Sequence, residues 1–363
     1  MRPVPSPLRG SESPLTADFD VALLDLDGVV YIGAQAVPGV PSALAEARRR
    51  GMRLGFVTNN AARTPQTVAA HLTELGIPAL PDEVITSAQA AARYLAERLP
   101  TGSAVLVLGT VGLEEALRER GLVPVFSADK AIEAVVQGYS PDLDWRQLAE
   151  GAVAINRGVP WVATNLDPTV PSPRGPLPGN GSLVAALRHA TRVAPTIATG
   201  KPDPTMHRES LLRSGASHPI VVGDRLDTDI EGANAVGCPS LLVLSGVTTP
   251  ADLLAAPNAL RPTFLAADAA GLLVAHPELD VGADTVGCGA WSASSGDEAL
   301  RLEFRGADGG ASVEDLDALR ALCAAYWTAD RADPAGRSDE VGEPAVEAVG
   351  EVAAAVLRRL GLG

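Results

Sequence analysis

The chain has 363 residues, of which 46% are hydrophobic and only 4% aromatic, so it can bury two or three domain cores packed mainly by aliphatic side chains. Its formal net charge of −15 argues against nucleic acid or an anionic membrane as a partner. Three cysteines, Cys238, Cys288 and Cys323, have no metal-binding spacing and no even number for disulfides, which favours the reduced thiols of a cytoplasmic protein.

The two ends of the chain differ in composition from the middle. Residues 1–17 are rich in Pro and Ser and lack the apolar core of a signal peptide, so we expect a disordered tail. Residues 277–363 carry 17 acidic and seven basic residues, so the rest of the chain is closer to neutral and suits an anionic substrate better. No apolar run approaches the ~18 residues that a membrane-spanning helix needs.

Strands and helices alternate after this tail, and the alternation restarts once. The first series consists of strand 21–26, helix 41–50, strand 53–57, helix 64–75, strand 83–86 and helix 87–99. The second has strands at 104–108, 123–126, 134–137 and 161–164 and helices at 113–120, 145–156 and 182–192. The first series then resumes with a helix capped by Asp203, strands 219–223, 240–244 and 263–266, and helices 229–236 and 268–276.

This order predicts an α/β fold with a doubly wound parallel sheet, formed by residues 18–98 and 196–276. A second α/β module is expected as an insertion at 99–195. From residue 277 the patterning weakens, although a strand at 300–304 and a helix at 313–327 are expected. Residues 277–363 are therefore either a small third module or a loosely packed appendage.

The chemistry is expected at the end of the first strand, in Asp25-Leu26-Asp27-Gly28. An unpaired carboxylate is costly inside a buried strand, so Asp25 should lie at the strand's carboxyl end, facing a cation and a substrate. Two carboxylates two residues apart suggest a nucleophile and an acid/base that share one metal. A calcium-binding EF-hand loop fits poorly, because its later ligand positions hold Val29 and Ala36. A structural pair that caps backbone amides is the other alternative.

Three further polar motifs follow predicted elements of the same fold: Thr58-Asn59-Asn60, Lys201 and Asp224–Asp229. In an open parallel sheet, ligands bind beyond the carboxyl ends of the strands, so these motifs are expected to converge with Asp25. The residue types fit phosphoryl transfer through an aspartyl phosphate on Asp25. Mg²⁺ would be held by two carboxylates and a backbone carbonyl, and Lys201 and the Thr58 hydroxyl would hold phosphate oxygens.

Each motif also has a purely structural interpretation. Thr58-Asn59-Asn60 taken alone is a turn, and Lys201 taken alone is a surface lysine. Only Lys130 and Lys201 are lysines among the 29 basic residues, which favours a specific need for a compact ammonium at position 201. Asp229 either begins its helix, favoured by the helix dipole, or steadies Asp224 or Lys201 from behind.

Taken in order, DLDGVVY, FVTNN, GKP and VVGDRLDTDI resemble the motifs of the haloacid-dehalogenase-like phosphatases. The insertion after the second motif resembles the C2-type cap of subfamily IIA, the NagD-like and 4-nitrophenylphosphatase-like enzymes. This resemblance, over residues 18–276, implies Asp25 as nucleophile and Asp27 as acid/base. It also implies Mg²⁺ on Asp25, Asp224 and the main-chain carbonyl of Asp27, and phosphate contacts from Thr58, Asn59, Asn60 and Lys201.

Further stretches resemble the actinobacterial glycerol-3-phosphate phosphatases within that subfamily. These are Thr58–Ala61, Thr86–Gln89, Asp167–Pro171, Leu177–Arg188 and Gly223–Ala235. The resemblance implies glycerol 3-phosphate as substrate. Phosphoglycolate, pyridoxal phosphate, sugar phosphates and nucleotide monophosphates remain alternatives, which the loop 165–181 would decide.

Enzymes of this group also carry a C-terminal extension that resembles an acyltransferase fold, and residues 277–363 have a suitable length. They lack an acyltransferase pyrophosphate loop, because Arg305 is followed three residues later by Asp308 rather than Gly. The expected partner is therefore a small phosphorylated metabolite, without nucleic acid or membrane. Association of two or more copies of the chain through the expected cap, which would form a homo-oligomer, is left open.

Overall fold

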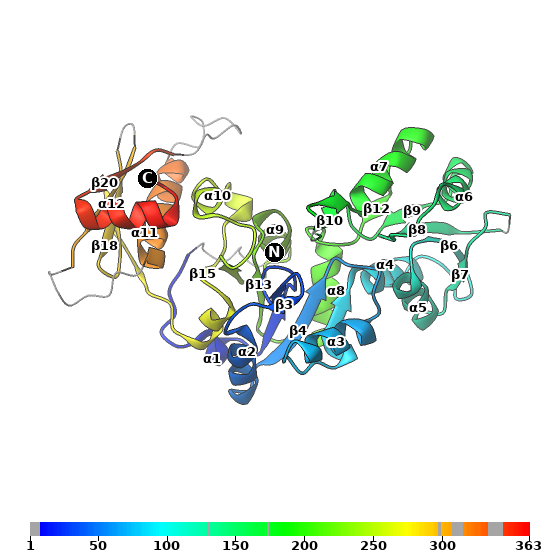
Figure 1. Cartoon of the computed structure of the whole chain (residues 1–363), viewed down its shortest axis with the longest axis horizontal. Coiled ribbons are helices and arrows are strands. Elements are labelled where there is room, and N and C mark those ends of the chain that lie inside the picture. Colours follow the sequence, from blue (N-terminus) through cyan, green and yellow to red (C-terminus); the bar gives the residue numbers. More distant parts are fainter. Residues whose placement is uncertain are drawn as a thin grey trace.

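The computed structural model describes residues 8–129, 131–170, 172, 174–296, 299–306, 315–332 and 344–363. They form three bodies in a row, with a core in the middle, an inserted module at one end and a C-terminal module at the other (Figure 1). Among these residues, no helix has both the length and the apolar composition needed to cross a bilayer.

The core is a six-stranded parallel sheet in the order β15-β14-β13-β1-β4-β5. Its strands are β1 (Val21–Leu24), β4 (Arg53–Thr58), β5 (Val84–Thr86), β13 (Pro219–Gly223), β14 (Ser240–Val243) and β15 (Phe264–Ala266). β1 pairs in parallel with β4 on one side and with β13 on the other. The strand order reverses at β1, so the carboxyl ends of these three strands form the topological switch point. The predicted doubly wound sheet is confirmed.

Helices cover both faces of this sheet because its strands are apolar on both sides. The core helices are α2 (Val40–Arg49), α3 (Pro65–Glu74), α4 (Ser87–Ala96), α8 (Pro204–Ser214), α9 (Glu231–Ala235) and α10 (Pro250–Leu254). Alternate residues of β1 pack into different clusters, Leu24 with Leu44 and Leu72, and Leu23 with Met206 and Ala233. A short hairpin, β2 (Tyr31–Ile32) and β3 (Gln35–Ala36), follows β1.

Helix starts in the core follow capping chemistry, with one correction. The Thr64 hydroxyl accepts the amide of Thr67 and Pro65 is the first helical residue, as predicted. Helix α4 is capped by Thr86 rather than Ser87, because Thr86 and Gln89 form a reciprocal capping box. The helix expected at 268–276 is only a 3-10 turn (Ala269–Leu273), and the residue before Pro277 is disfavoured in a helix.

The inserted module has its own five-stranded sheet in the order β12-β9-β8-β6-β7. The strands are β6 (Ala104–Leu108), β7 (Val123–Val125), β8 (Ala134–Gln137), β9 (Trp161–Ala163) and β12 (Ile197–Ala198), and the helices are α5 (Val111–Glu119), α6 (Trp145–Asn156) and α7 (Asn180–Thr191). A small hairpin, β10 (Thr169–Val170) and β11 (Leu177–Pro178), lies between β9 and α7. This sheet ends at Ala198, so it extends past the expected boundary at residue 195.

The C-terminal module is a five-stranded sheet in sequential order, packed against two helices. The strands are β16 (Leu279–Val281), β17 (Thr285–Cys288), β18 (Trp291–Ser295), β19 (Leu300–Phe304) and β20 (Val346–Val349), and the helices are α11 (Asp315–Ala332) and α12 (Glu351–Leu360). Leu319 and Leu322 of α11 share one buried cluster with Leu253 and Leu265 of the core. The C-terminal module therefore packs against the core and is not loosely attached. Positions 313 and 314 of the expected helix lie outside the described residues.

The expected tail at 1–17 is partly wrong. Residues 1–7 lie outside the described residues, but residues 8–17 are packed onto the core. The amides of Leu8 and Arg9 donate to the carbonyls of Pro262 and Thr263, and both Leu8 and Leu15 are buried. A short helix, α1 (Leu15–Asp18), then leads into β1. Two buried leucines and backbone hydrogen bonds to the core thus hold a segment whose composition is otherwise typical of disorder.

Candidate active site

Asp25 directly follows β1, at the edge where β1, β4 and β13 end. Its backbone amide still donates to the carbonyl of Val222, so the residue is held in line with the sheet. Its Oδ1 accepts a hydrogen bond from Lys201 Nζ at 2.5 Å, and its side chain is only 13% exposed. Burial raises the pKa of Asp25; Lys201 opposes this shift, whereas Asp229 and Asp224 add to it. Positive charge next to Asp25, such as that of Lys201, favours its ionised form.

Asp224 follows β13 and is fully buried. Its Oδ2 accepts the amide of Val247 at 2.7 Å, whereas its Oδ1 has no hydrogen-bond partner among the described residues. Gly28 and Gly246 pack against this carboxylate so closely that a Cβ on either would overlap it. Burial raises the pKa of Asp224 to about 6, and the charge of Asp229 adds to the shift. A buried carboxylate oxygen without a donor fits a ligand of a hard cation.

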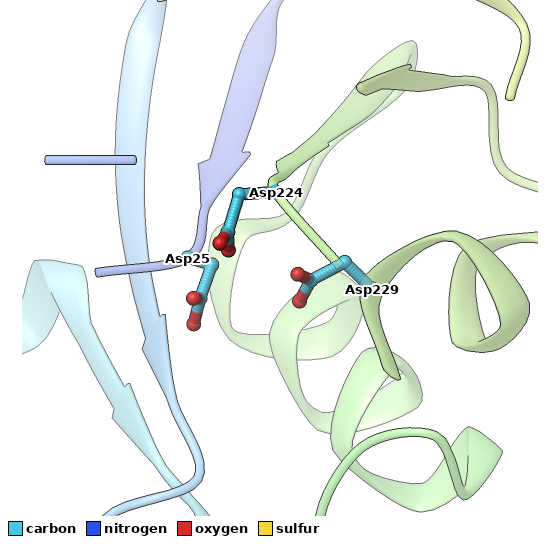
Figure 2. A group of neighbouring side chains, drawn as sticks. All are labelled: Asp25, Asp224 and Asp229. Carbon is cyan, nitrogen blue, oxygen red and sulfur yellow. The ribbon is translucent and has the colours of Figure 1, made fainter. Parts of the chain in front are cut away.

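Figure 2 shows Asp25, Asp224 and Asp229 converging from β1, from β13 and from the segment that follows β13. Each offers one carboxylate oxygen, and these three oxygens lie within 4.8 Å of one another. Asp229, however, already accepts from Lys201 Nζ at 2.7 Å and from the Arg225 amide at 3.2 Å, through different oxygens. These contacts favour the predicted role in which Asp229 steadies Lys201 from behind the proposed metal ligands.

A π-helical turn, Leu226–Ile230, brings Asp229 into this position. A regular α-helix was expected from Asp229 onward, but α9 begins only at Glu231. The wider turn lets Asp229 point back toward Gly223, where a Cβ would overlap the Asp229 side chain. The extra residue in the turn thus positions Asp229 in the site and does not extend the regular α-helix.

Lys201 is buried, with a side chain that is 4% exposed, so the interpretation as a surface lysine is wrong. Its ammonium donates to Asp25 and Asp229 and lies 3.4 Å from the carbonyl oxygen of Val57. Burial alone would lower the pKa of Lys201, but the two carboxylates outweigh it and raise the pKa. The lysine therefore stays protonated and is a fixed positive charge beside Asp25.

The Thr58-Asn59-Asn60 motif ends β4 and divides into two roles. The Thr58 hydroxyl accepts the Asn60 amide at 3.1 Å, which leaves its proton available for a phosphate oxygen. Asn59 instead binds the backbone of Lys201: its Oδ1 accepts the Lys201 amide at 2.8 Å and its Nδ2 donates to the Lys201 carbonyl at 3.1 Å. Asn60 Oδ1 accepts the amide of Ala62 and closes a turn. Direct phosphate contacts from the two Asn side chains stay a prediction, and the Asn59 bonds favour positioning.

Asp27 lies at the mouth of the site, where its side chain reaches solvent. Surrounding protein atoms nevertheless raise its pKa by desolvation, while Lys201 and Arg63 lower it. The Tyr31 hydroxyl also hydrogen-bonds to Asp27. A carboxyl with a raised pKa at the rim can carry the proton that a departing group needs.

Sequence reasoning missed Asp167 and Tyr31 as site residues. Asp167 comes from the loop between β9 and α7, and its carboxylate accepts from Asn59 Nδ2 at 3.2 Å. Burial raises the pKa of Asp167, and Asn165 beside it donates to the Asn59 carbonyl at 2.8 Å. In the sequence, a carboxylate in a loop rich in Pro and Gly was the signal that could have identified Asp167. Its contact with Asn59 depends on how the inserted module packs on the core.

Family models match the core, the first part of the inserted module and the C-terminal module. Residues 22–123 match the haloacid dehalogenase-like hydrolases, and residues 198–272 match a HAD-hydrolase-like model. Residues 288–362 match a GCN5-related N-acetyltransferase like domain.

Two curated proteins illustrate the similarity. The D-glycerol 3-phosphate phosphatase of Mycobacterium tuberculosis is 44% identical over 325 residues, which make up 88% of this chain and 89% of that protein. An acid sugar phosphatase of Staphylococcus aureus is 36% identical over 237 residues, which make up 65% of this chain and 90% of that protein.

Solved structures of phosphatases show the same similarity to this chain. A crystal structure of glycerol phosphate phosphatase from M. tuberculosis in complex with magnesium has a TM-score of 0.83 at 40% identity, covering 96% of this chain and 99% of that chain. A 4-nitrophenylphosphatase from Thermotoga maritima has a TM-score of 0.66 at 29% identity, covering 71% of this chain and 98% of that chain. The likeness to the first structure thus includes the C-terminal module.

Proposed function

This chain belongs to the haloacid dehalogenase-like hydrolases, and we propose that it is a Mg²⁺-dependent phosphatase of small phosphate monoesters, with glycerol 3-phosphate as its preferred substrate. The observation that carries the proposal is the buried contact of Lys201 with Asp25, next to the unpartnered Oδ1 of Asp224 in the described structure. The choice of glycerol 3-phosphate is supported by the relative that shares 44% identity over 88% of the chain.

In this mechanism, Asp25 attacks phosphorus and becomes an aspartyl phosphate, while the bond from phosphorus to the ester oxygen breaks. Asp27 gives its proton to the departing alkoxide, so glycerol leaves neutral. The ionised Asp27 then takes a proton from water, which attacks the phosphoenzyme and releases phosphate. Lys201 and the Thr58 hydroxyl stabilise negative charge on the phosphoryl oxygens, and Asp229 and Asn59 hold Lys201 in place.

Mg²⁺ would be held by the carboxylates of Asp25 and Asp224 and the main-chain carbonyl of Asp27. The donor set is all oxygen, and the buried Oδ1 of Asp224 needs a partner, as a hard cation site requires. When bound, the ion supplies the positive charge that lets two buried carboxylates and a phosphate dianion share one site. The glycines at 28 and 246 leave room for the Asp224 carboxylate, which a Cβ at either position would displace.

Residues 99–195 would act as a C2-type cap that chooses the substrate without supplying chemistry. All of the proposed catalytic and metal residues lie outside this segment, in the proposed catalytic core of residues 18–98 and 196–276. Asp167 and Asn165 are the cap residues that touch Asn59, so the loop 165–181 borders the phosphate site. A carboxylate there would repel a second anionic group, which argues for a polyol ester over a nucleotide with several phosphates.

We further propose a cytoplasmic enzyme that associates through its cap. The three cysteines are buried and form no disulfide with one another, which fits a reducing compartment. Strand β7 is an edge strand of the cap sheet; Val123 in this strand is 46% exposed and Phe126, directly after it, is 55% exposed. Light scattering on the wild type and on Phe126→Asp tests this association. A monomer at micromolar concentration in both would exclude it.

A phosphate-release screen with MgCl2 tests the activity, over glycerol 3-phosphate, phosphoglycolate, pyridoxal phosphate, sugar phosphates and nucleotide monophosphates. We expect the highest kcat/KM for glycerol 3-phosphate and no turnover by Asp25→Asn. A different preferred ester would correct the substrate and keep the phosphatase. Equal phosphate release by the wild type and Asp25→Asn would reject the mechanism.

A further inference from the structure

A loop of the core, Ser245–Thr249, touches both halves of the proposed metal site. The Val247 amide donates to Asp224 Oδ2 at 2.7 Å, and the Thr248 amide donates to the Asp224 carbonyl at 3.1 Å. The Ser245 hydroxyl donates to the carbonyl of Gly28 at 2.7 Å, in the loop that follows Asp25. The position of this loop therefore decides which way the Asp224 carboxylate faces.

The loop runs directly into α10, and α10 is held by the C-terminal module. Thr249 caps α10 through a capping box with Asp252, so the loop and the helix form one unit. Leu253 and Leu254 of α10 are buried in the cluster that also contains Leu322. Trp327 of α11 is 3% exposed, and its Nε1 donates to the carbonyl of Leu254 at 3.1 Å.

Other bonds fix α11 on the same part of the core. Arg320, which is 9% exposed, donates to the carbonyl of Leu265 in β15. Asp317, one turn earlier in α11, accepts a second hydrogen bond from Arg320 at 2.7 Å and holds the guanidinium in place. The guanidinium of Arg261 lies 5.0 Å from the centre of the Trp327 ring, a cation–π distance. A helix tied to β15 and α10 together cannot slide along the core without breaking buried hydrogen bonds.

We propose that Trp327 is a positioning residue for Mg²⁺ binding, and that α11 of the C-terminal module serves as a brace for the Asp224 loop. The chain of contacts runs from Trp327 to Leu254, through α10 to Val247, and from Val247 to Asp224. The brace keeps one oxygen of Asp224 on the Val247 amide, so that the other faces the cation. This role rests on the Mg²⁺ site of the proposed function and requires no acyl transfer by the module.

Trp291 provides a matched control inside the same module. It is 2% exposed and packs on Phe304, but its Nε1 has no hydrogen-bond partner among the described residues. Replacing either tryptophan by Phe removes an indole from a buried site. Only Trp327→Phe also removes the bond to α10.

The test is Mg²⁺ binding to the full chain without substrate, by calorimetry and by the rise of Tm with MgCl2. We expect Trp327→Phe to raise the Kd for Mg²⁺ about three- to tenfold, the loss of roughly one buried hydrogen bond. Trp291→Phe should lower Tm similarly but change the Kd less than about twofold. Trp327→Ala should show a larger effect on the Kd, if it folds.

Three outcomes are distinguishable. If the wild type binds Mg²⁺ and Trp327→Phe binds it equally well, the brace is refuted and the proposed phosphatase is untouched. If both Phe variants weaken binding equally, general destabilisation explains the effect and Trp327 has no positioning role. If the wild type shows no Mg²⁺ binding at all, the metal site of the proposed function fails first, and the brace fails with it.

Discussion

Lys201 Nζ lies 2.5 Å from Oδ1 of Asp25, and both side chains are nearly shielded from solvent. This contact pairs the proposed nucleophile with a point charge that Asp229 and Asn59 hold from two other directions. A wide, planar guanidinium cannot replace an ammonium in a pocket built around two short bonds to Asp25 and Asp229.

Lys201→Arg should therefore be damaging although it keeps the charge. We expect kcat/KM to fall at least tenfold, which corresponds to about 1.4 kcal/mol of transition-state stabilisation. Steady-state kinetics with saturating Mg²⁺ measure the loss, with Arg118→Lys on the exposed face of α5 as a control. Wild-type kinetics for Lys201→Arg would show that the site needs only a positive charge.

A titration with MgCl2 should distinguish the roles of Asp224 and Asp229. Asp224→Asn removes the charge of the proposed ligand, so the rise of Tm with MgCl2 should disappear. Asp229→Asn removes a partner of Lys201, so turnover should fall about 10- to 100-fold while part of the Mg²⁺-dependent rise in Tm remains. An equal loss of metal binding in both variants would make Asp229 a direct ligand.

His207 should make the protein sensitive to mild acid. Burial lowers its pKa to about 3, and the nearby positive charge of Lys201 acts in the same direction. The unfolded value is about 6.5, so the neutral ring stabilises the fold fully above that pH and loses its contribution as the pH falls toward 3. By linkage the loss is about 2 kcal/mol at pH 5.

Urea unfolding at pH 7 and pH 5 measures this contribution. The wild type should lose about 2 kcal/mol more than His207→Gln between the two pH values, because glutamine does not titrate. His218→Gln, at an exposed position, should lose as much as the wild type. Identical losses in the wild type and His207→Gln would mean that His207 is accessible to protons in the folded state.

The substrate preference should follow the cap. A chimera in which residues 99–198 come from a nucleotide-preferring relative should hydrolyse nucleotides better and still require Mg²⁺. The splice point is placed at residue 198 because β12 completes the cap sheet there. A folded chimera with unchanged preference would assign specificity to the core, with Tyr31 and Arg63 as the first residues to test.

Sequence patterns predicted the site where apolar strands end in polar residues. Asp25 and Asp224 directly follow such strands and Thr58 ends one, and parallel strands present their ends at one edge. The roles of Asn59 and Val247 could not be predicted in this way. Asn59 acts on the backbone of Lys201, which is 142 residues away in the sequence, and Val247 acts through its amide, which every residue but proline possesses.

The roles of Asp25 and Asp27 should separate by leaving group. Asp25→Asn removes the nucleophile, so every ester should fail alike. Asp27→Asn removes the proton donor and leaves the nucleophile in place. Glycerol phosphate expels a strongly basic alkoxide that needs this proton in the transition state, whereas nitrophenyl phosphate expels a stable phenolate that needs it far less.

Asp27→Asn should therefore lose about 10²- to 10⁴-fold more rate with glycerol phosphate than with nitrophenyl phosphate when Asp25 is phosphorylated. Steady-state turnover would hide the contrast, because Asp27 also activates water in the second step, so single-turnover phosphorylation must be measured. Tyr31→Phe is a useful companion, since it removes the hydroxyl beside Asp27 but leaves the carboxyl. It should slow phosphorylation by glycerol phosphate far less than Asp27→Asn does. Equal losses on both esters for Asp27→Asn would show that Asp27 is not the acid, and would give the second carboxylate an electrostatic or folding role.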